Sequence, residues 1–282
     1  MVTPENFAMQ LSLLKECFEI LDVHALADSI NELKNETDPK CIITFDDAWF
    51  DNYDYAYSIL EEHSCPAIIF APTDYVASDK TFWQEELGRL IWSAKQTGSQ
   101  QSLKLLARYQ IESDESDLDS QKNKIMNYVR SLKVKPYEEI DAIISDFTNL
   151  NPQDAYPIVD RHMTWEQLNK LSDNGIAIGS HACSHRILTK IDKYETKIEL
   201  SKSKDIIEKK LNKPVKWIAY PNGDYHKEIG RLANEIGYEY GFGTIYGHLD
   251  ENTDLYNINR LNVNDAVASN RPMFMATLLG IF

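Results

Sequence analysis

Residues 41–48 read CIITFDDA, an apolar, β-branched run that leads directly into two adjacent aspartates. Such a run is typical of a strand that is buried in a parallel sheet. Comparable short apolar runs recur along the chain, at residues 67–71, 176–179, 215–220, 238–242 and 258–263. Helical patterns separate most of them, and strands that alternate with helices indicate βαβ units. The sequence therefore predicts an α/β fold built on a parallel sheet.

Two helical features complete this pattern. The expected helices around the strands cover residues 7–18, 22–33, 52–62, 164–172, 193–211 and 227–236. Thr164 followed by Gln167 is a capping-box pattern that marks the start of one of them. Residues 82–150 instead read as three or four consecutive amphipathic helices without a strand. We interpret this segment as a helical insertion within a single domain that spans residues 1–282.

Composition excludes several classes of protein. The chain has 282 residues, 43% of them hydrophobic, and a formal net charge of -15. This charge repels phosphate backbones, so nucleic acid is not an expected partner. The four cysteines form no CxxC pair, and the N-terminus lacks the basic and apolar regions of a secretory signal. We expect a cytoplasmic protein without a transmembrane segment, in which the apolar residues 273–282 form a helix packed on the body.

Polar residues follow four of the predicted strands. Asp46 and Asp47 follow the first run, and His181 and His185 follow the run at 176–179. The other clusters are Pro221-Asn222-Gly223 and Asn264-Asp265. The carboxyl ends of parallel barrel strands open onto one face, where active sites are built. The four clusters are therefore expected to share that face.

The aspartate pair and the two histidines suggest a metal site. Adjacent carboxylates repel each other, and a cation relieves this repulsion. His181 and His185 stand four residues apart and could bind one ion from one face of a helical turn. Helix capping by the aspartates and two ordinary surface histidines remain the structural alternatives. Two histidines and one carboxylate suit zinc hydrolysis or non-haem iron oxygenation, and a spare carboxylate at Asp46 favours hydrolysis.

Three motifs resemble those of the polysaccharide deacetylases, the NodB-homology domain of carbohydrate esterase family four. They are TFDDA at 44–48, SHACSH at 180–185 and AYPNGDY at 219–225. FWQEELGRLIW and HMTWEQLNKLSDNGIAIGSH resemble a branch found in surface-polysaccharide biosynthesis. The resemblance implies a distorted, partly open (β/α) barrel of about six to seven mostly parallel strands. It also implies one divalent metal held by Asp47, His181 and His185, with Asp46 as general base. Zinc is the expected metal, with cobalt, nickel, manganese or iron as alternatives.

Three positions depart from the family pattern. Ala48 replaces the usual glycine, and Ala219 stands where many members carry an arginine that fixes the base. Arg260 is the candidate substitute for that arginine, with a surface ion pair as the alternative. The late motif that usually supplies the general acid is absent, so His248 or His162 is the candidate proton donor.

The third motif is expected to contact substrate. The resemblance implies that a backbone amide near Tyr220 helps to hold the oxyanion. Tyr220, Pro221 and Asn222 are candidates for substrate binding. Trp49 and Tyr225 are candidates for stacking on a sugar ring, although core packing is the alternative for each. The leading hypothesis is a metal-dependent N-deacylase that removes an acetyl or formyl group from an amino sugar or glycan. A catalytically impaired metal- or sugar-binding relative and an iron oxygenase are the rival hypotheses, and the oligomeric state is left open.

Overall fold

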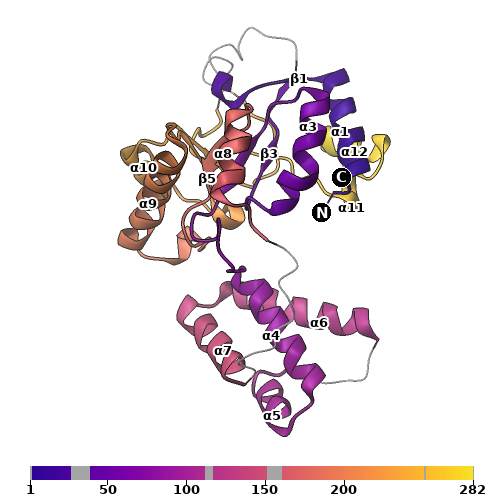
Figure 1. The fold of residues 1–282 in the computed structure, drawn as a ribbon, viewed down its shortest axis with the longest axis vertical. Coiled ribbons are helices and arrows are strands. Elements are labelled where there is room, and N and C mark those ends of the chain that lie inside the picture. The colour runs from indigo at the N-terminus through magenta and orange to yellow at the C-terminus, as the bar shows by residue number, and fades with distance from the viewer. Residues whose placement is uncertain (1, 27–38, 112–116, 151–160, 251, 282) are drawn as a thin grey trace. The chain divides into compact units, whose positions relative to one another are not determined.

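The computed structural model describes residues 2–26, 39–111, 117–150, 161–250 and 252–281 (Figure 1). The chain divides into two compact units. One unit consists of residues 1–78 and 161–282, and the other of residues 79–160. The predicted strands all fall in the first unit, which therefore contains the candidate site.

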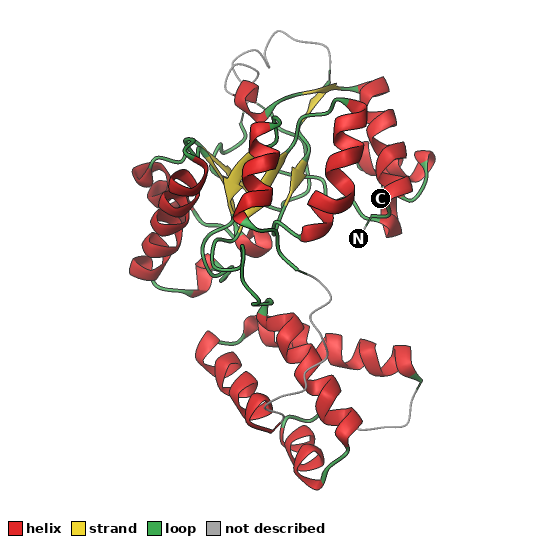
Figure 2. Cartoon of the chain, viewed as in Figure 1, coloured by secondary structure: helices red, strands yellow, loops and turns green. Residues whose placement is uncertain are grey.

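The first unit is built on parallel strands, as expected. Five of them form one sheet in chain order: β3 (Thr44–Phe45), β4 (Ile68–Ala71), β5 (Ala177–Ser180), β6 (Trp217–Ala219) and β7 (Tyr240–Phe242). A second parallel pair joins β1 (Glu19–Ile20) to β2 (Lys40–Cys41). The five-stranded sheet curls into a half-barrel with helices around it (Figure 2), which confirms the α/β, partly open barrel.

Helices surround this sheet, most of them at positions where the sequence predicts a helix. They are α1 (Pro4–Cys17), α3 (Tyr57–His63), α8 (Trp165–Asp173), α9 (Lys193–Leu211), α10 (Lys227–Ile236), α11 (Asp265–Ala268) and α12 (Arg271–Leu278). A π-helical turn, Asn52–Ala56, leads into α3. The capping box is confirmed, since Thr164 and Gln167 exchange side-chain and backbone hydrogen bonds at the start of α8. Among the described residues, no helix combines the length and the apolar character that crossing a membrane requires.

Side chains alternate between two cores along the strands. Ile69, Ile178 and Ile218 pack against the surrounding helices, whereas the neighbouring Ile68 and Phe70 pack with Trp217 on the other face of the sheet. This alternation is the expected two-residue period of a strand. Because both faces are apolar, the strands read as continuous hydrophobic runs.

Two predicted strands differ from the structure. Residues 41–45 do not form one strand, because β2 pairs with β1 while β3 pairs with β4. Within residues 258–263, only Ile258 forms a bridge, to Phe242. The next rung of that ladder would use the Gly243 carbonyl, but the Arg260 side chain donates to this oxygen instead. The Arg260 backbone N–H donates to Ile245, so the segment leaves the sheet.

Two further helices were predicted in this unit, at residues 22–33 and 273–282. Of the predicted helix at residues 22–33, a short 3-10 turn (Val23–Ala25) is described, and residues 27–33 lie outside the described residues. The apolar C-terminal segment forms α12, as expected. Phe274 and Leu278 of α12 pack with Leu13 of α1. Burial therefore accounts for much of the apolar character of this segment.

The second unit is helical over its described residues. It contains α4 (Trp83–Thr97), α5 (Gln100–Arg108), α6 (Leu118–Ser131), a 3-10 turn (Leu132–Val134) and α7 (Tyr137–Leu150). Helix α4 packs against the other three. Its buried residues Leu87, Ile91 and Ala94 make one side of the helix apolar, which is the amphipathic pattern seen in the sequence.

Candidate metal centre

The aspartate pair lies in a tight turn at the carboxyl end of β3. Asp47 and Ala48 adopt left-handed backbone angles, with φ of 72° and 52°. Glycine adopts this conformation without steric strain, which explains why the resembling family favours glycine where this chain has Ala48. Backbone hydrogen bonds to the segment just before α8 hold the turn: the Met163 N–H donates to the Ala48 carbonyl, and the Phe50 N–H donates to the Arg161 carbonyl. Tertiary contacts thus stabilise the strained turn.

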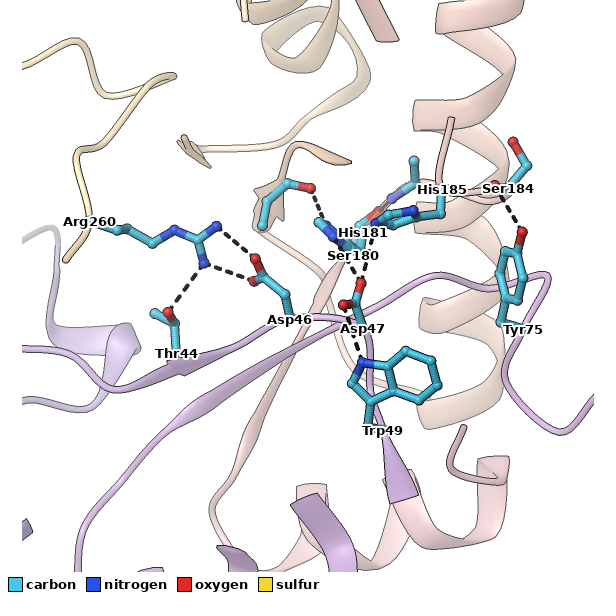
Figure 3. Close-up of polar contacts among 12 residues, drawn as sticks. Thr44, Asp46, Asp47, Trp49, Tyr75, Ser180, His181, Ser184, His185 and Arg260 are labelled. Atoms are coloured by element: carbon cyan, nitrogen blue, oxygen red, sulfur yellow. Dashed lines mark hydrogen bonds and ion pairs between the residues drawn. The ribbon is translucent and has the colours of Figure 1, made fainter. Parts of the chain in front are cut away.

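Asp47, His181 and His185 converge on one point, as Figure 3 shows. Asp47 Oδ1 lies 3.4 Å from His181 Nε2 and 3.2 Å from His185 Nε2. One ligand atom from each residue falls within 4.8 Å of the other two. Asp47 Oδ1 is buried and forms no hydrogen bond of acceptable geometry with the described residues. A buried oxygen facing two imidazole nitrogens fits a divalent metal, which all three atoms can ligate.

The surroundings prepare these groups for metal binding. His181 Nδ1 lies 2.7 Å from the carbonyl oxygen of Ala219, at the end of β6. With its N–H at Nδ1, His181 presents the Nε2 lone pair to the site, a common arrangement of metal-binding histidines. Burial disfavours ionisation of Asp47, but the two histidines outweigh this and lower the pKa of its carboxyl. Asp47 is therefore anionic at neutral pH.

Asp46 points away from the histidines and pairs with Arg260 (Figure 3). The guanidinium donates to both carboxylate oxygens, at 2.8 Å each. It also donates to Thr44 Oγ1 at 3.2 Å and to the Gly243 carbonyl at 2.7 Å. Burial by itself would raise the pKa of the Asp46 carboxyl. The charge and hydrogen bonds of Arg260 outweigh burial, so the pKa is lowered. Arg260 therefore makes the contact with Asp46 for which it was the candidate in place of an arginine at position 219.

Trp49 and His162 lie beside the candidate metal-binding residues. The Trp49 indole N–H donates to Asp47 Oδ2 at 3.3 Å, and its ring stacks on His162 at 4.2 Å. His162 is only 5% exposed, and burial lowers its pKa to about 4, with an opposing effect from Asp47. His162 is therefore neutral at pH 7. Trp49 has one ring face covered and its N–H committed to a candidate metal ligand.

The third motif lies differently from its expected position. The Tyr220 N–H donates to Phe242 within the sheet, so this amide is not available to an oxyanion. The Tyr220 side chain is fully buried, and its ring lies 5.4 Å from that of Tyr225. Tyr225 donates to Asp254 at 2.7 Å. Pro221 is buried beside them, so core packing accounts for these three residues.

The remaining candidates are peripheral. Asn222 is exposed and donates to Asp224 from its side-chain amide. His248 is exposed in the loop after β7, and its side chain forms no hydrogen bond with the described residues. Asn264 is the N-cap of α11, and Asp265 accepts from the Thr3 N–H. The fourth polar cluster therefore begins a helix and anchors the N-terminal segment.

Comparisons with known proteins identify the family of this chain. A family model for polysaccharide deacetylase matches residues 34–241. YxkH of Bacillus subtilis (strain 168), provisionally described as a polysaccharide deacetylase, is 27% identical over 154 residues. That alignment covers 48% of this chain and 55% of YxkH, so the chain spans about half the length of this curated relative.

Solved structures share the fold at low sequence identity. The deacetylase PplD of Streptococcus pyogenes, in complex with acetate, has a TM-score of 0.62 and 18% identity, covering 98% of this chain and 87% of PplD. IcaB from Ammonifex degensii has a TM-score of 0.61 and 12% identity, covering 98% of this chain and 88% of IcaB. These likenesses show the fold. Because the family model matches more than half of the sequence, this chain belongs to the polysaccharide deacetylase family.

Proposed function

We propose that this protein is a metal-dependent N-deacylase that hydrolyses an N-acetyl or N-formyl amide on an amino sugar of a glycan. The observation that carries the proposal is the convergence of Asp47, His181 and His185 next to the paired Asp46 and Arg260. Family membership supports deacylation, and the acidic chain favours a substrate that is not strongly anionic.

The metal would be held by Asp47, His181 and His185. Two imidazoles and a carboxylate leave coordination positions open, and zinc is the metal that this set favours for hydrolysis. A bound zinc ion supplies Lewis-acid polarisation of the acyl carbonyl and lowers the pKa of water. Cobalt, nickel, manganese and iron suit the same ligands, and metal analysis distinguishes them.

Asp46 is assigned as the general base. It is adjacent to Asp47 in the chain, and Arg260 keeps it ionised and fixed in orientation. Each carboxylate oxygen retains a second lone pair after accepting from Arg260, so the group can still take a proton from an attacking water. Arg260 is a positioning residue here, since its contacts are to Asp46, Thr44 and Gly243.

The proton for the leaving amine has two candidate donors, His162 and His248. His162 packs against Trp49 beside the site, but burial keeps it neutral at pH 7. His248 is exposed and would have to act from the loop after β7. Replacing each separately by glutamine discriminates between them: the donor variant should lose about 100-fold or more in kcat. The other variant should retain most of its activity.

The central test combines metal analysis with release of acetate or formate from a panel of N-acylated amino sugars and their oligomers. We expect Asp46→Asn to keep metal and lose about 100-fold or more in kcat. His181→Ala should lose both metal and activity. Asp224→Asn, which changes a half-buried carboxylate after β6, is the matched control and should behave as wild type. Retained turnover in Asp46→Asn would sink the assignment of the base.

The same assay separates the rival functions. Wild-type protein that binds metal but releases no acyl group across the panel would be a metal- or sugar-binding relative. Activity with zinc under nitrogen would exclude an iron oxygenase, because that chemistry requires molecular oxygen. Full activity after complete removal of metal by a chelator would contradict the proposed metal dependence.

A further inference from the structure

The turn between the two candidate metal-binding histidines has an unfavourable backbone conformation. Ala182 and His185 adopt left-handed angles, with φ of 60° and 55°. Residues other than glycine rarely adopt this region, and such conformations persist only where surrounding contacts impose them. The spacing between the His181 and His185 side chains therefore depends on whatever holds residues 182–184.

The carbonyls of this turn are bound from one side. The Thr73 and Asp74 N–H groups, which follow β4, donate to the Ala182 and Cys183 carbonyls at 3.2 Å and 3.0 Å. Tyr75 donates from its hydroxyl to the Ser184 carbonyl at 3.4 Å (Figure 3). These bonds anchor the turn to the neighbouring strand end. The backbone N–H groups of the turn take no part in these bonds and have other partners.

Glu199 accepts hydrogen bonds from the N–H groups of the turn. One of its carboxylate oxygens accepts the Cys183 N–H at 2.7 Å and the Ser184 N–H at 2.9 Å. The other accepts the Ser184 hydroxyl at 2.5 Å. Glu199 lies on α9, next to the buried Leu200 and one helical turn after the buried Thr196. A half-buried carboxylate thus accepts three hydrogen bonds from Cys183 and Ser184, two of the three residues between the histidines.

We infer that Glu199 is a positioning residue for the metal centre, which sets the separation of His181 and His185 by clamping the turn between them. The inference rests on the proposed metal binding by these histidines. Groups behind metal ligands orient the ligands, and their loss typically lowers metal affinity about 10–100-fold. Glu199 differs from the usual case, because it acts on the backbone between two ligands rather than on either imidazole.

Zinc affinity of the purified protein, measured by competition with a chromogenic chelator, tests this inference. We expect Glu199→Ala to bind zinc about 10–100-fold more weakly than wild type. Glu199→Gln should stay close to wild type, because its amide oxygen can accept both N–H groups while its NH₂ donates to the Ser184 hydroxyl. A role for negative charge alone would predict that Gln is as damaging as Ala.

Glu208 provides the matched control on the same helix. Its carboxylate accepts the Val215 N–H at 2.9 Å and pairs with Lys204 at 2.9 Å, so it also fastens a loop to α9. Glu208→Ala should lower the melting temperature but leave zinc affinity unchanged. If Glu199→Ala fails to fold, Glu199→Asp replaces it: it keeps the charge, loses reach, and should weaken zinc binding more than Gln does.

The outcomes are distinct from those of the proposed function. Equal zinc affinity in wild type and the Ala or Asp variant overturns the positioning role, whatever the activity. A wild-type protein that binds zinc without deacylating overturns the function, and the affinity series still decides the role of Glu199. If Glu208→Ala loses as much zinc affinity as Glu199→Ala, the loss reflects general destabilisation of the protein. This outcome would reject the inference.

Discussion

The turns after β3 and β5 differ from the turn after β6, although all three follow parallel strands at the same edge of one sheet. In the first two, charged groups from distant segments meet: Asp47 faces two histidines, and Asp46 pairs with Arg260. After β6, by contrast, Tyr220 is buried and Tyr225 bonds to Asp254. A position at a strand end therefore does not by itself place a residue in the candidate metal centre. Contacts between loops decide which side chains lie there.

Loss of Arg260 should produce the largest effect. Arg260→Gln leaves the partly buried Asp46 carboxylate without its charged partner, and we expect a loss of about 1–3 kcal/mol in the free energy of unfolding. Activity should fall about 100-fold, because the base loses its orientation. Urea unfolding and acyl release measure the two effects. The control is Arg271→Gln, which breaks a similar two-oxygen pair with the exposed Glu16 and should change little. Similar effects of the two variants would contradict the role of Arg260.

Burial of His162 should make the stability of the metal-free protein depend on pH. Its folded pKa is about 4, below the ordinary value of 6.5. Above pH 6.5 the imidazole is neutral in both states, so its burial carries no ionisation penalty. As pH falls from 6.5 towards 4, the unfolded state takes up the proton first, and the free energy of unfolding decreases. His162→Phe should reduce this slope in urea titrations with a chelator present. An unchanged slope would contradict the lowered pKa.

Trp49 is expected to act through Asp47. Trp49→Phe keeps a ring next to His162 but removes the N–H that donates to Asp47 Oδ2. We expect zinc affinity to weaken by about three- to tenfold. This loss is smaller than is usual for a group that orients a metal ligand, because the hydrogen bond from Trp49 to Asp47 is long. Chelator competition measures the change. If zinc affinity is instead unchanged and KM rises, Trp49 contacts the sugar as the sequence first suggested.

Tyr225→Phe should have the smallest effect. It removes one hydrogen bond, to Asp254, and we expect a loss of no more than about 1 kcal/mol in stability. Zinc affinity and acyl release should remain within about twofold of wild type, since its contacts lie in the core after β6. A loss of activity above tenfold without destabilisation would return Tyr225 to the substrate site.

Several features could be predicted because they depend on local chemistry. Short apolar runs that alternate with helical segments predicted the parallel strands, and Thr164 with Gln167 predicted the start of α8. Asp47, His181 and His185 were identified by their spacing and by resemblance, and the structure brings these three together. By the same local reasoning, Asn264 was grouped with the site, although it is a helix cap.

Glu199 was missed, although a signal for it exists. Buried positions on α9 recur at Thr196, Leu200, Ser203 and Ile207, and Glu199 lies beside this stripe. A carboxylate next to the buried face of an amphipathic helix requires a partner, because an unpaired charge is unfavourable there. The sequence raises that question but does not name the partner, since the turn at 182–184 meets α9 only in three dimensions.

The sequence by itself determined the α/β class, the start of α8 and the choice of candidate metal ligands, because each depends on residue type and short spacing. Only the tertiary structure decided that Arg260 pairs with Asp46, that Glu199 clamps the histidine turn and that Tyr225 belongs to the core. These contacts join segments far apart in the chain, and their partners are selected by how the loops pack at the edge of the sheet. Short-range patterns contain no such information, so the pairing of charges across loops emerges only with the fold.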